Sequence, residues 1–223
     1  MKKPFLLFLL LVFVSRAADA QVSAGPVFNL CFANVKGGLN DQANKFKIGM
    51  RAGFFLKLDV SESVSIQPEI LYSTRGYVQK SLSSTSVSVK DTSIKHNFSY
   101  IDFPFLANIR AADNIYMLIG PQLGYLSNAR SKGTISIGPK TSAVDTNDVY
   151  GFNTTEYSLV MGGGYKFKFP LDASLRFTYG LTKLYQGEGK TSHNFYFQIG
   201  VSYSFGSGSG VGSSGGSTIY KTF

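Results

Sequence analysis

Apolar and polar residues alternate along most of the chain. Between residues 46 and 58 every even position is apolar, whereas the odd positions are mostly basic residues or glycine. Strict alternation over this length predicts a β-strand with one apolar face and one polar face. A helix would instead distribute these apolar residues around its circumference.

The same alternation recurs along the rest of the chain and predicts eight strands. The expected strands cover residues 27–35, 46–58, 64–75, 100–110, 115–125, 156–169, 174–181 and 194–205. The first of them alternates more weakly than the others. On the apolar faces we expect residues such as Ile48, Phe54, Ile70, Phe103 and Leu175 to contact lipid.

The connections between these strands alternate in length. Short turns are expected at 59–62, 111–114 and 170–172, and longer links at 36–45, 78–97, 128–153 and 186–192. Outer-membrane barrels have short periplasmic turns and long outer loops. With an even number of strands, both termini then lie on the side of the short turns.

Strand length distinguishes a membrane barrel from a soluble β-sandwich, which also alternates polar and apolar residues. Most of the expected strands have about ten to thirteen residues, closer to the ~9–11 of a membrane strand than to the ~5–6 of a soluble one. Their polar faces are rich in Gly and Ser, and Tyr and Phe gather near strand ends. Because an open sheet edge in lipid leaves backbone groups unpaired, the sheet must close. The prediction is an all-β fold, an eight-stranded antiparallel up-and-down transmembrane β-barrel over residues 21–205.

The N-terminal residues have the pattern of an export signal. Lys2 and Lys3 precede an apolar run over residues 5–14, which is too short to span a bilayer, and Ala18-Asp19-Ala20 resembles a cleavage site. We expect a signal peptide over residues 1–20, cleaved after Ala20, and localisation in the cell outer membrane. At the other end, residues 206–223 are mostly Gly and Ser and are expected to form a flexible tail.

Composition and charge narrow the class of partner. The chain contains 24 Gly, 19 Phe and 13 Tyr, and its formal charge is +9, or +7 once residues 1–20 are removed. Export and the absence of a binding motif argue against nucleic acid, whereas a basic exterior fits an anionic lipid surface. Cys31 is the single cysteine, so no intramolecular disulfide is expected, and we interpret it as a small residue within a strand.

Several local motifs resemble the PorT-like outer-membrane β-barrel family across residues 22–205. They are Gln67-Pro68-Glu69-Ile70-Leu71-Tyr72 with Gly76, Tyr100-Ile101-Asp102-Phe103-Pro104, Gly120-Pro121 with Gly124-Tyr125, and Arg176-Phe177-Thr178-Tyr179-Gly180-Leu181. The resemblance implies an outer-membrane barrel. Most members of that family lack an assigned activity, and its name comes from a member involved in protein secretion. A component of a secretion or assembly machine is therefore the alternative function that the resemblance implies.

Ionisable residues on the polar strand faces are the first candidates for chemistry. They are Arg51, Glu69, Arg75, Asp102, Arg110, Glu156, Lys166 and Arg176. In an eight-stranded barrel the side chains just fill the interior, so these charges are expected to pair into a plug, with Glu69 close to Arg51. The alternative is a path for protons or ions.

No catalytic, cofactor-binding or metal-binding residue is predicted, and no cofactor. His96 and His193 are the only histidines, expected near the outer rim, and Ser192 adjoins the second. A lipid-modifying hydrolase is the enzymatic alternative, but nothing places a base beside a nucleophile with a third orienting group. Residues 162–164 are three glycines within a strand, which we interpret as room for bulky lumen side chains rather than a phosphate loop.

The long links carry the remaining candidates. Lys80, Lys90 and Lys95 lie in residues 78–97, and Arg130, Lys132 and Lys140 lie in residues 128–153. They are candidates to bind anionic lipid headgroups or an external ligand, or else they simply form solvated loops. The expected partners are outer-membrane lipid and lipopolysaccharide, the barrel-insertion machinery, and a secretion-system or extracellular protein. Residues 197–205 resemble the C-terminal segment that the insertion machinery recognises. The predicted function is a non-enzymatic barrel with a structural or loop-mediated binding role.

Overall fold

The structure is a computed structural model that describes residues 22–37, 44–80, 89–137, 140–147, 149–186 and 192–205. The expected signal peptide and the Gly/Ser-rich tail lie outside these residues. Within them the strands are β1 (Val22–Lys36), β2 (Asn44–Asp59), β3 (Val64–Lys80), β4 (Val89–Arg110), β5 (Ile115–Ile137), β6 (Lys140–Asn147), β7 (Thr155–Lys166), β8 (Leu171–Gly180) and β9 (His193–Tyr203). The described residues include no helix with the length and hydropathy that crossing a membrane would require.

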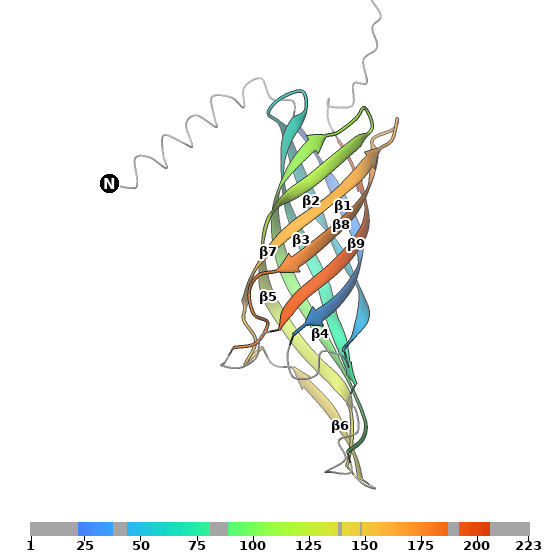
Figure 1. Ribbon diagram of the computed structural model, residues 1–223, viewed down its shortest axis with the longest axis vertical. Coiled ribbons are helices and arrows are strands. Elements are labelled where there is room, and N and C mark those ends of the chain that lie inside the picture. The colour runs from blue at the N-terminus through green and yellow to red at the C-terminus, as the bar shows by residue number, and fades with distance from the viewer. Residues whose placement is uncertain are drawn as a thin grey trace, which may run out of the picture.

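Eight of these strands form a closed antiparallel barrel. The order is β4-β3-β2-β1-β9-β8-β7-β5, and a further pairing of β4 with β5 joins the two ends (Figure 1). The pairing of β1 with β9 brings the two ends of the barrel sequence together, and Phe205 extends this contact through a bridge to Ala24. Closure removes the free edges that lipid would not tolerate. The predicted eight-stranded barrel is confirmed.

The two faces of each strand follow the predicted alternation. Ile48, Phe54 and Leu175 point outward and are more than 60% exposed, whereas Arg51 is buried in the lumen. On the outside, apolar side chains form a belt over residues 64–72 of β3, 101–109 of β4 and 115–125 of β5. These lengths match the ~9–11 residues of a membrane-spanning strand. We call this surface the apolar belt.

Several element boundaries differ from those expected. β1 begins at Val22 rather than at Val27, because its first residues pair with the end of β2, Val22 with Leu58. β7 ends at Lys166 rather than at residue 169, because a turn begins there and the Phe167 amide donates to the Leu171 carbonyl. The last short turn therefore lies at residues 167–170.

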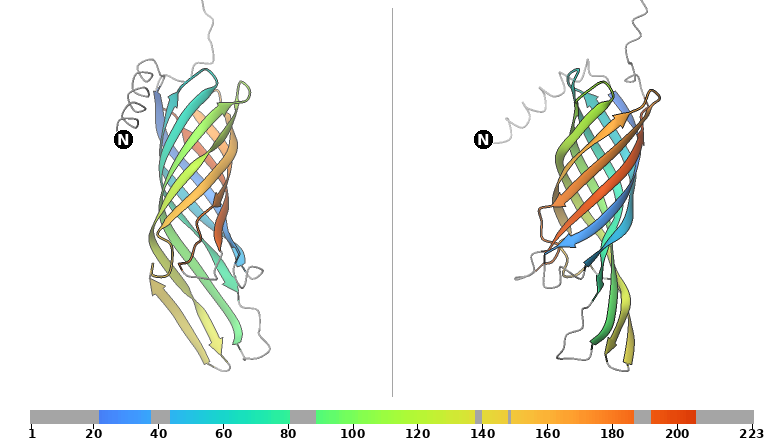
Figure 2. Two further views of the ribbon diagram at one scale, coloured as in Figure 1. Left: turned by 60° about the vertical axis from the view of Figure 1, so that its left-hand side comes forward. Right: turned by 45° about the vertical axis from the view of Figure 1, so that its right-hand side comes forward.

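The largest difference concerns two of the expected long loops. β3 runs to Lys80, β4 begins at Val89, and β5 continues to Ile137, where β6 pairs alongside it. These strands project past the barrel at the end opposite the short turns (Figures 1 and 2). We call residues 89–97 of β4, residues 128–137 of β5, and β6 the outer blade. None of these segments has an apolar residue at every second position, so periodicity did not predict them.

Candidate functional site

The lumen of the barrel holds a buried network of charged side chains. Arg51, Arg75 and Asp102 are each at most 1% exposed and come from β2, β3 and β4. One Asp102 oxygen lies 3.1 Å from Arg51 Nη2 and 3.2 Å from Arg75 Nη1. Arg75 Nη2 also lies 2.9 Å from Glu156 Oε1. Each of these two guanidinium groups therefore has a carboxylate partner.

Neutral side chains add to the coordination of these two arginines, whose Nε atoms have no hydrogen-bond partner among the described residues. Arg51 donates to Gln122 Oε1 at 2.9 Å and to Gln198 Oε1 at 2.5 Å. Arg75 donates to the Tyr196 hydroxyl at 2.7 Å, and its guanidinium lies 3.8 Å from the centre of the Tyr100 ring. Such hydrogen bonds are required to offset the free-energy cost of removing buried charges from water. The network joins strands from opposite sides of the barrel across the lumen.

A second ion pair lies in the same lumen. Arg176 Nη1 donates to both oxygens of Glu69, at 2.8 and 3.0 Å, and Gln67 donates to Glu69 Oε1 at 2.7 Å. The expected proximity of Glu69 to Arg51 is wrong, because Arg51 faces Ser73 across the hairpin. The turn lies at residues 60–63, where the amides of residues 60 and 61 both bond to the Val64 carbonyl, and it moves the register along the strand.

Glycines make room for these large side chains. A Cβ atom at Gly124 would lie 2.7 Å from Asp102 Oδ1 and 3.2 Å from Arg75 Nη2. A Cβ atom at Gly164 would lie 2.3 Å from the Tyr116 ring. Both contacts are closer than side chains adopt, so any larger residue would have to displace the lumen packing. The expectation that residues 162–164 leave room for lumen side chains is confirmed at Gly164.

Two of the eight ionisable residues expected in the lumen lie elsewhere. Arg110 is exposed at the end of β4, and Lys166 is only half-buried at the end of β7. Both lie beside the short turns, where the barrel opens to water. The lumen thus contains three arginines and three carboxylates among the residues that the structure describes.

An aromatic cluster closes the lumen at its outer end. The His96 ring stacks on Tyr77 at 4.6 Å, and Phe98 packs against Phe152 at 5.0 Å. Phe152 in turn packs against Tyr185, whose hydroxyl bonds with that of Tyr77. Segments 149–154 and 181–186 thereby cover the strands below them.

His96 lies beyond the apolar belt, where the neighbouring outward residues of β4 are polar. Its Nδ1 is 2.9 Å from the Ser131 hydroxyl. Burial and, to a smaller extent, the Lys47 ammonium lower the pKa of His96 from 6.5 to about 4. The imidazole is therefore neutral at pH 7. His96 was expected at the outer rim ahead of a strand, whereas it lies within β4.

The residues considered for catalysis are not assembled into a catalytic set. The Ser192 hydroxyl donates to the Gly37 carbonyl at 2.9 Å, and His193 Nδ1 lies 3.0 Å from the Gly180 carbonyl. The two side chains are thus each bound to a different backbone segment. Cys31 is buried in β1, with its thiol 3.4 Å from the Thr74 carbonyl, as expected of a small strand residue. Among the described residues, no group of three or more potential ligands could hold a metal ion.

The outer blade brings three basic side chains together. Lys95 of β4 faces Lys132 of β5, and Asn97 faces Arg130 two pairs farther along the ladder, on the same face. Asp145 of β6 forms ion pairs with Arg130 at 3.0 Å and with Lys132 at 3.5 Å. The sequence identified these basic residues as candidates, but it did not indicate that they are neighbours. The side chains of Lys80, Lys90 and Lys140 lie outside the described set.

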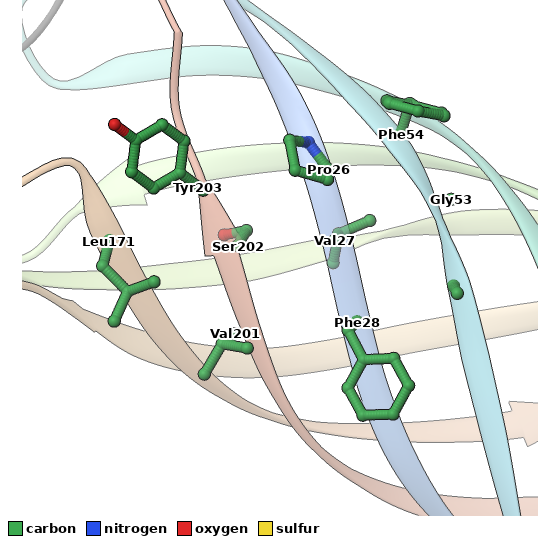
Figure 3. A pocket seen from close by; sticks show the side chains of 10 residues that line it. Pro26, Val27, Phe28, Gly53, Phe54, Leu171, Val201, Ser202 and Tyr203 are labelled. Carbon is green, nitrogen blue, oxygen red and sulfur yellow. The ribbon is translucent and has the colours of Figure 1, made fainter.

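A shallow hollow of about 520 Å³ lies on the outer surface of the barrel (Figure 3). Pro26 and Ala52 are the small outward residues in it, and Phe28, Phe54 and Tyr203 surround them. None of its lining residues is charged. It belongs to the lipid-facing surface and offers no group for chemistry.

The chain is similar to several solved structures. A search of solved structures finds the attachment invasion locus protein Ail of Yersinia pestis, 12% identical, covering 83% of this chain and 99% of that one, with a TM-score of 0.44. Neisserial surface protein A is 11% identical over 82% and 97%, with a TM-score of 0.40. The outer membrane protease OmpT of Escherichia coli is 11% identical over 83% and 96%, also at 0.40. No curated protein matches the chain.

A family model gives the assignment directly. The model described as the outer membrane protein beta-barrel domain matches residues 17–186, which is well over half of the chain. Those residues contain strands β1 to β8 together with the charged side chains of the lumen and the outer blade. This chain therefore belongs to the outer membrane protein β-barrel domain family and is an outer-membrane protein.

Proposed function

We propose that this protein is a non-enzymatic, non-conducting barrel that holds the outer blade outside the membrane for binding. The observation that carries this proposal is the contrast between a filled lumen and a regular sheet that continues past it. Arg75, at the centre of the lumen, binds two carboxylates and two tyrosines. The blade continues the barrel ladder as far as the pairing of Val89 with Ile137. A rigid scaffold that presents a projecting surface is a common arrangement for binding.

Absence of catalysis is part of the same proposal. One of the similar solved structures is a protease by name, so the question applies to this chain. Here the Ser192 hydroxyl and the His193 ring are bound to backbone carbonyls of different segments. A nucleophile that lacks an adjacent base is weak. We expect purified protein to cleave neither peptide nor lipid ester substrates.

Conductance measurements test the central claim. The full chain, refolded into planar bilayers, should show no large and stable openings, because eight strands leave an interior that side chains fill. A large, stable conductance would overturn the proposal. In whole cells, a cysteine introduced at exposed Thr134 of the blade should react with a membrane-impermeant thiol reagent. Labelling only after lysis would place the blade on the periplasmic side and would also overturn it.

A second candidate is a component of a secretion or assembly machine. The motif resemblance to PorT-like barrels supports it, in particular the residues around Glu69 and Asp102. Deletion of the gene would then leave proteins that are normally secreted inside the cell. Unchanged secretion in the deletion strain would exclude this candidate and leave the first.

We further propose that the chain is exported with cleavage after Ala20 and that residues 206–223 are dispensable. N-terminal sequencing of the outer-membrane form should start at Gln21. Truncation after Phe205 should leave a folded, heat-modifiable barrel, because Phe205 already pairs with Ala24 through two backbone hydrogen bonds. Phe205→Asp should impair assembly. If truncation after Phe205 abolishes insertion while Phe205→Asp is harmless, the insertion signal lies in residues 219–223.

A further inference from the structure

The outer blade contains a pair of like charges that is only partly compensated. Lys95 and Lys132 are direct cross-strand partners, and both side chains are exposed. Side chains in such a position lie about 5 Å apart at Cβ, and like charges there destabilise the sheet. Arg130 lies on the same face, two pairs closer to the barrel. Three cationic side chains therefore share one small surface, which we call the basic cluster.

The carboxylate beside the basic cluster offsets only part of its charge. Asp145 accepts hydrogen bonds from Arg130 Nε and Nη2, both at 3.0 Å, and its other cationic contact is Lys132 at 3.5 Å. Among the described residues no carboxylate forms an ion pair with Lys95. The cluster thus keeps two positive charges in excess of Asp145, and these attract an anion.

The basic cluster lies on the lipid-facing side of the sheet rather than on its lumen side. Along β4 the residues Lys95, Asn97, Ser99 and Ile101 share one face, and Ile101 belongs to the apolar belt. A register shift between Ser99 and Tyr100 turns Arg130 and Lys132 of β5 onto this same face. The cluster therefore continues the surface that contacts lipid.

The basic cluster begins just beyond the lipid headgroup layer. Ile101 and Tyr125 form the last apolar pair, and the pair of Asn97 with Arg130 follows four residues along β4. A strand rise of about 3.3 Å per residue and a tilt of about 40° place that pair ~10 Å beyond the belt. The pair of Lys95 with Lys132 lies two residues farther along β4, ~15 Å beyond the belt. The headgroup layer of a leaflet is roughly 5–8 Å thick, so the cluster lies outside it, and its long basic side chains reach back toward the phosphates at its surface.

We propose that Lys95, Arg130 and Lys132 bind the phosphate groups of the glycolipid in the outer leaflet, the lipid A part of lipopolysaccharide. Guanidinium and ammonium groups form charge-assisted hydrogen bonds with phosphate oxygens. Asp145 acts as an internal counter-ion that holds Arg130 in place and competes with the phosphate. The site faces sideways along the membrane rather than outward from the blade tip, which favours a lipid over a soluble polyanion. This inference rests on the proposed function, because the blade must lie outside the cell.

The test measures lipid A binding to full-length protein refolded without lipopolysaccharide. Native mass spectrometry in detergent compares lipid A carrying both phosphates with lipid A from which they have been removed. The triple variant Lys95→Gln, Arg130→Gln and Lys132→Gln should lose binding by about tenfold or more, because each charge-assisted hydrogen bond contributes substantially. Arg110→Gln, an exposed arginine at the other end of β4, is the matched control and should bind as the parent does.

Asp145→Asn supplies the result that a purely structural cluster would not give. Removing the competing carboxylate should strengthen binding of phosphorylated lipid A and leave binding of the dephosphorylated form unchanged. Heat-modifiable migration in gels confirms that each variant is folded. Binding of the triple variant equal to that of the parent overturns the inference.

Two further measurements are needed. One distinguishes lipid A from soluble anions as the ligand, and the other distinguishes failure of this inference from failure of the proposed function. Inorganic phosphate and a soluble sulfated polysaccharide are added in competition with lipid A. Displacement by the polysaccharide at low concentration, with no retention of lipid A, overturns the inference in favour of a soluble polyanion. A blade that labels from outside whole cells but does not bind lipid A rejects this inference alone. A blade that labels only after lysis rejects the proposed function as well.

Discussion

The lumen and the outer blade both gather basic side chains, but they balance them differently. In the lumen Arg51, Arg75 and Arg176 are each at most 4% exposed, and three carboxylates accompany them. On the blade, among the side chains that the structure describes, Asp145 is the one carboxylate that accompanies three exposed cations. Burial makes an unpaired charge very costly, whereas water and salt screen an exposed one. The same residue types are therefore structural inside the barrel and available for binding outside it.

Removing a lumen carboxylate should produce the largest effect. Asp102→Ala leaves Arg51 without a carboxylate and Arg75 with one, in a site that water does not reach. We expect a loss of about 3–5 kcal/mol in the free energy of unfolding, the usual cost of breaking a buried ion pair. Denaturant titration of the barrel in lipid vesicles, followed by tyrosine fluorescence or gel shift, measures it.

The matched change on the blade is Asp145→Asn. Its unfolding midpoint should coincide with that of the parent, because exposed ion pairs contribute little to stability. If Asp145→Asn destabilised the protein as much as Asp102→Ala does, the charges of the blade would be as important for stability as those of the lumen.

Charge on the lipid-facing surface should produce the next largest effect. Phe103 points outward within the apolar belt, so Phe103→Arg should cost ~2–4 kcal/mol if it lies near the midplane. Ser99 lies on the same face of β4 but beyond the belt, so Ser99→Arg should cost about 0–1 kcal/mol. The same vesicle titration measures both variants. Similar costs at the two positions would show that the edge of the belt is misplaced.

Overpacking of the lumen should have a smaller effect. Gly164→Val would push its side chain into the Tyr116 ring and is expected to cost roughly 1–3 kcal/mol. The double variant Gly164→Val with Tyr116→Leu should recover part of this loss, because the ring is the group displaced. A variant at Gly151, which has open space around its Cβ position but a φ of 84°, would report backbone strain instead of packing. No recovery in the double variant would mean that Ala173 on the neighbouring strand, not Tyr116, limits the space.

The smallest effect expected is a local pH dependence at the junction of the two regions. The pKa of His96 in the folded protein is about 4, below its ordinary value of 6.5. A locally unfolded state, in which the imidazole is exposed to water, therefore binds the proton more readily. The stabilisation is complete above pH 6.5 and is lost as the pH falls toward 4. NMR titration of the imidazole and hydrogen exchange at neighbouring amides measure this, and His96→Gln should abolish the dependence. Titration near 6.5 would mean that water enters between Tyr77 and Phe98.

The sequence by itself determined which face of each barrel strand meets lipid. Lipid on one side and packed polar groups on the other impose a period of two, so the outward direction of Ile48, Phe54 and Leu175 follows from the alternation alone. The same reasoning predicted eight strands and the alternation of short and long links. It missed the blade strands, because β6 has water on both faces and its backbone pairing leaves no trace in hydrophobic periodicity.

Only the tertiary structure decided which charges meet. Glu69 and Arg176 are 107 residues apart and become partners because the sheet closes and brings opposite walls together. Pairing of Arg51 with Glu69 would need a hairpin centred at about residue 60, whereas the observed register is centred at about residue 62 and gives Arg51 a different neighbour, Ser73. Likewise, the shift between Ser99 and Tyr100 places Lys132 beside Lys95 on the outer face. Local alternation fixes the direction of a side chain, but register and closure are properties of the whole barrel and determine its partner.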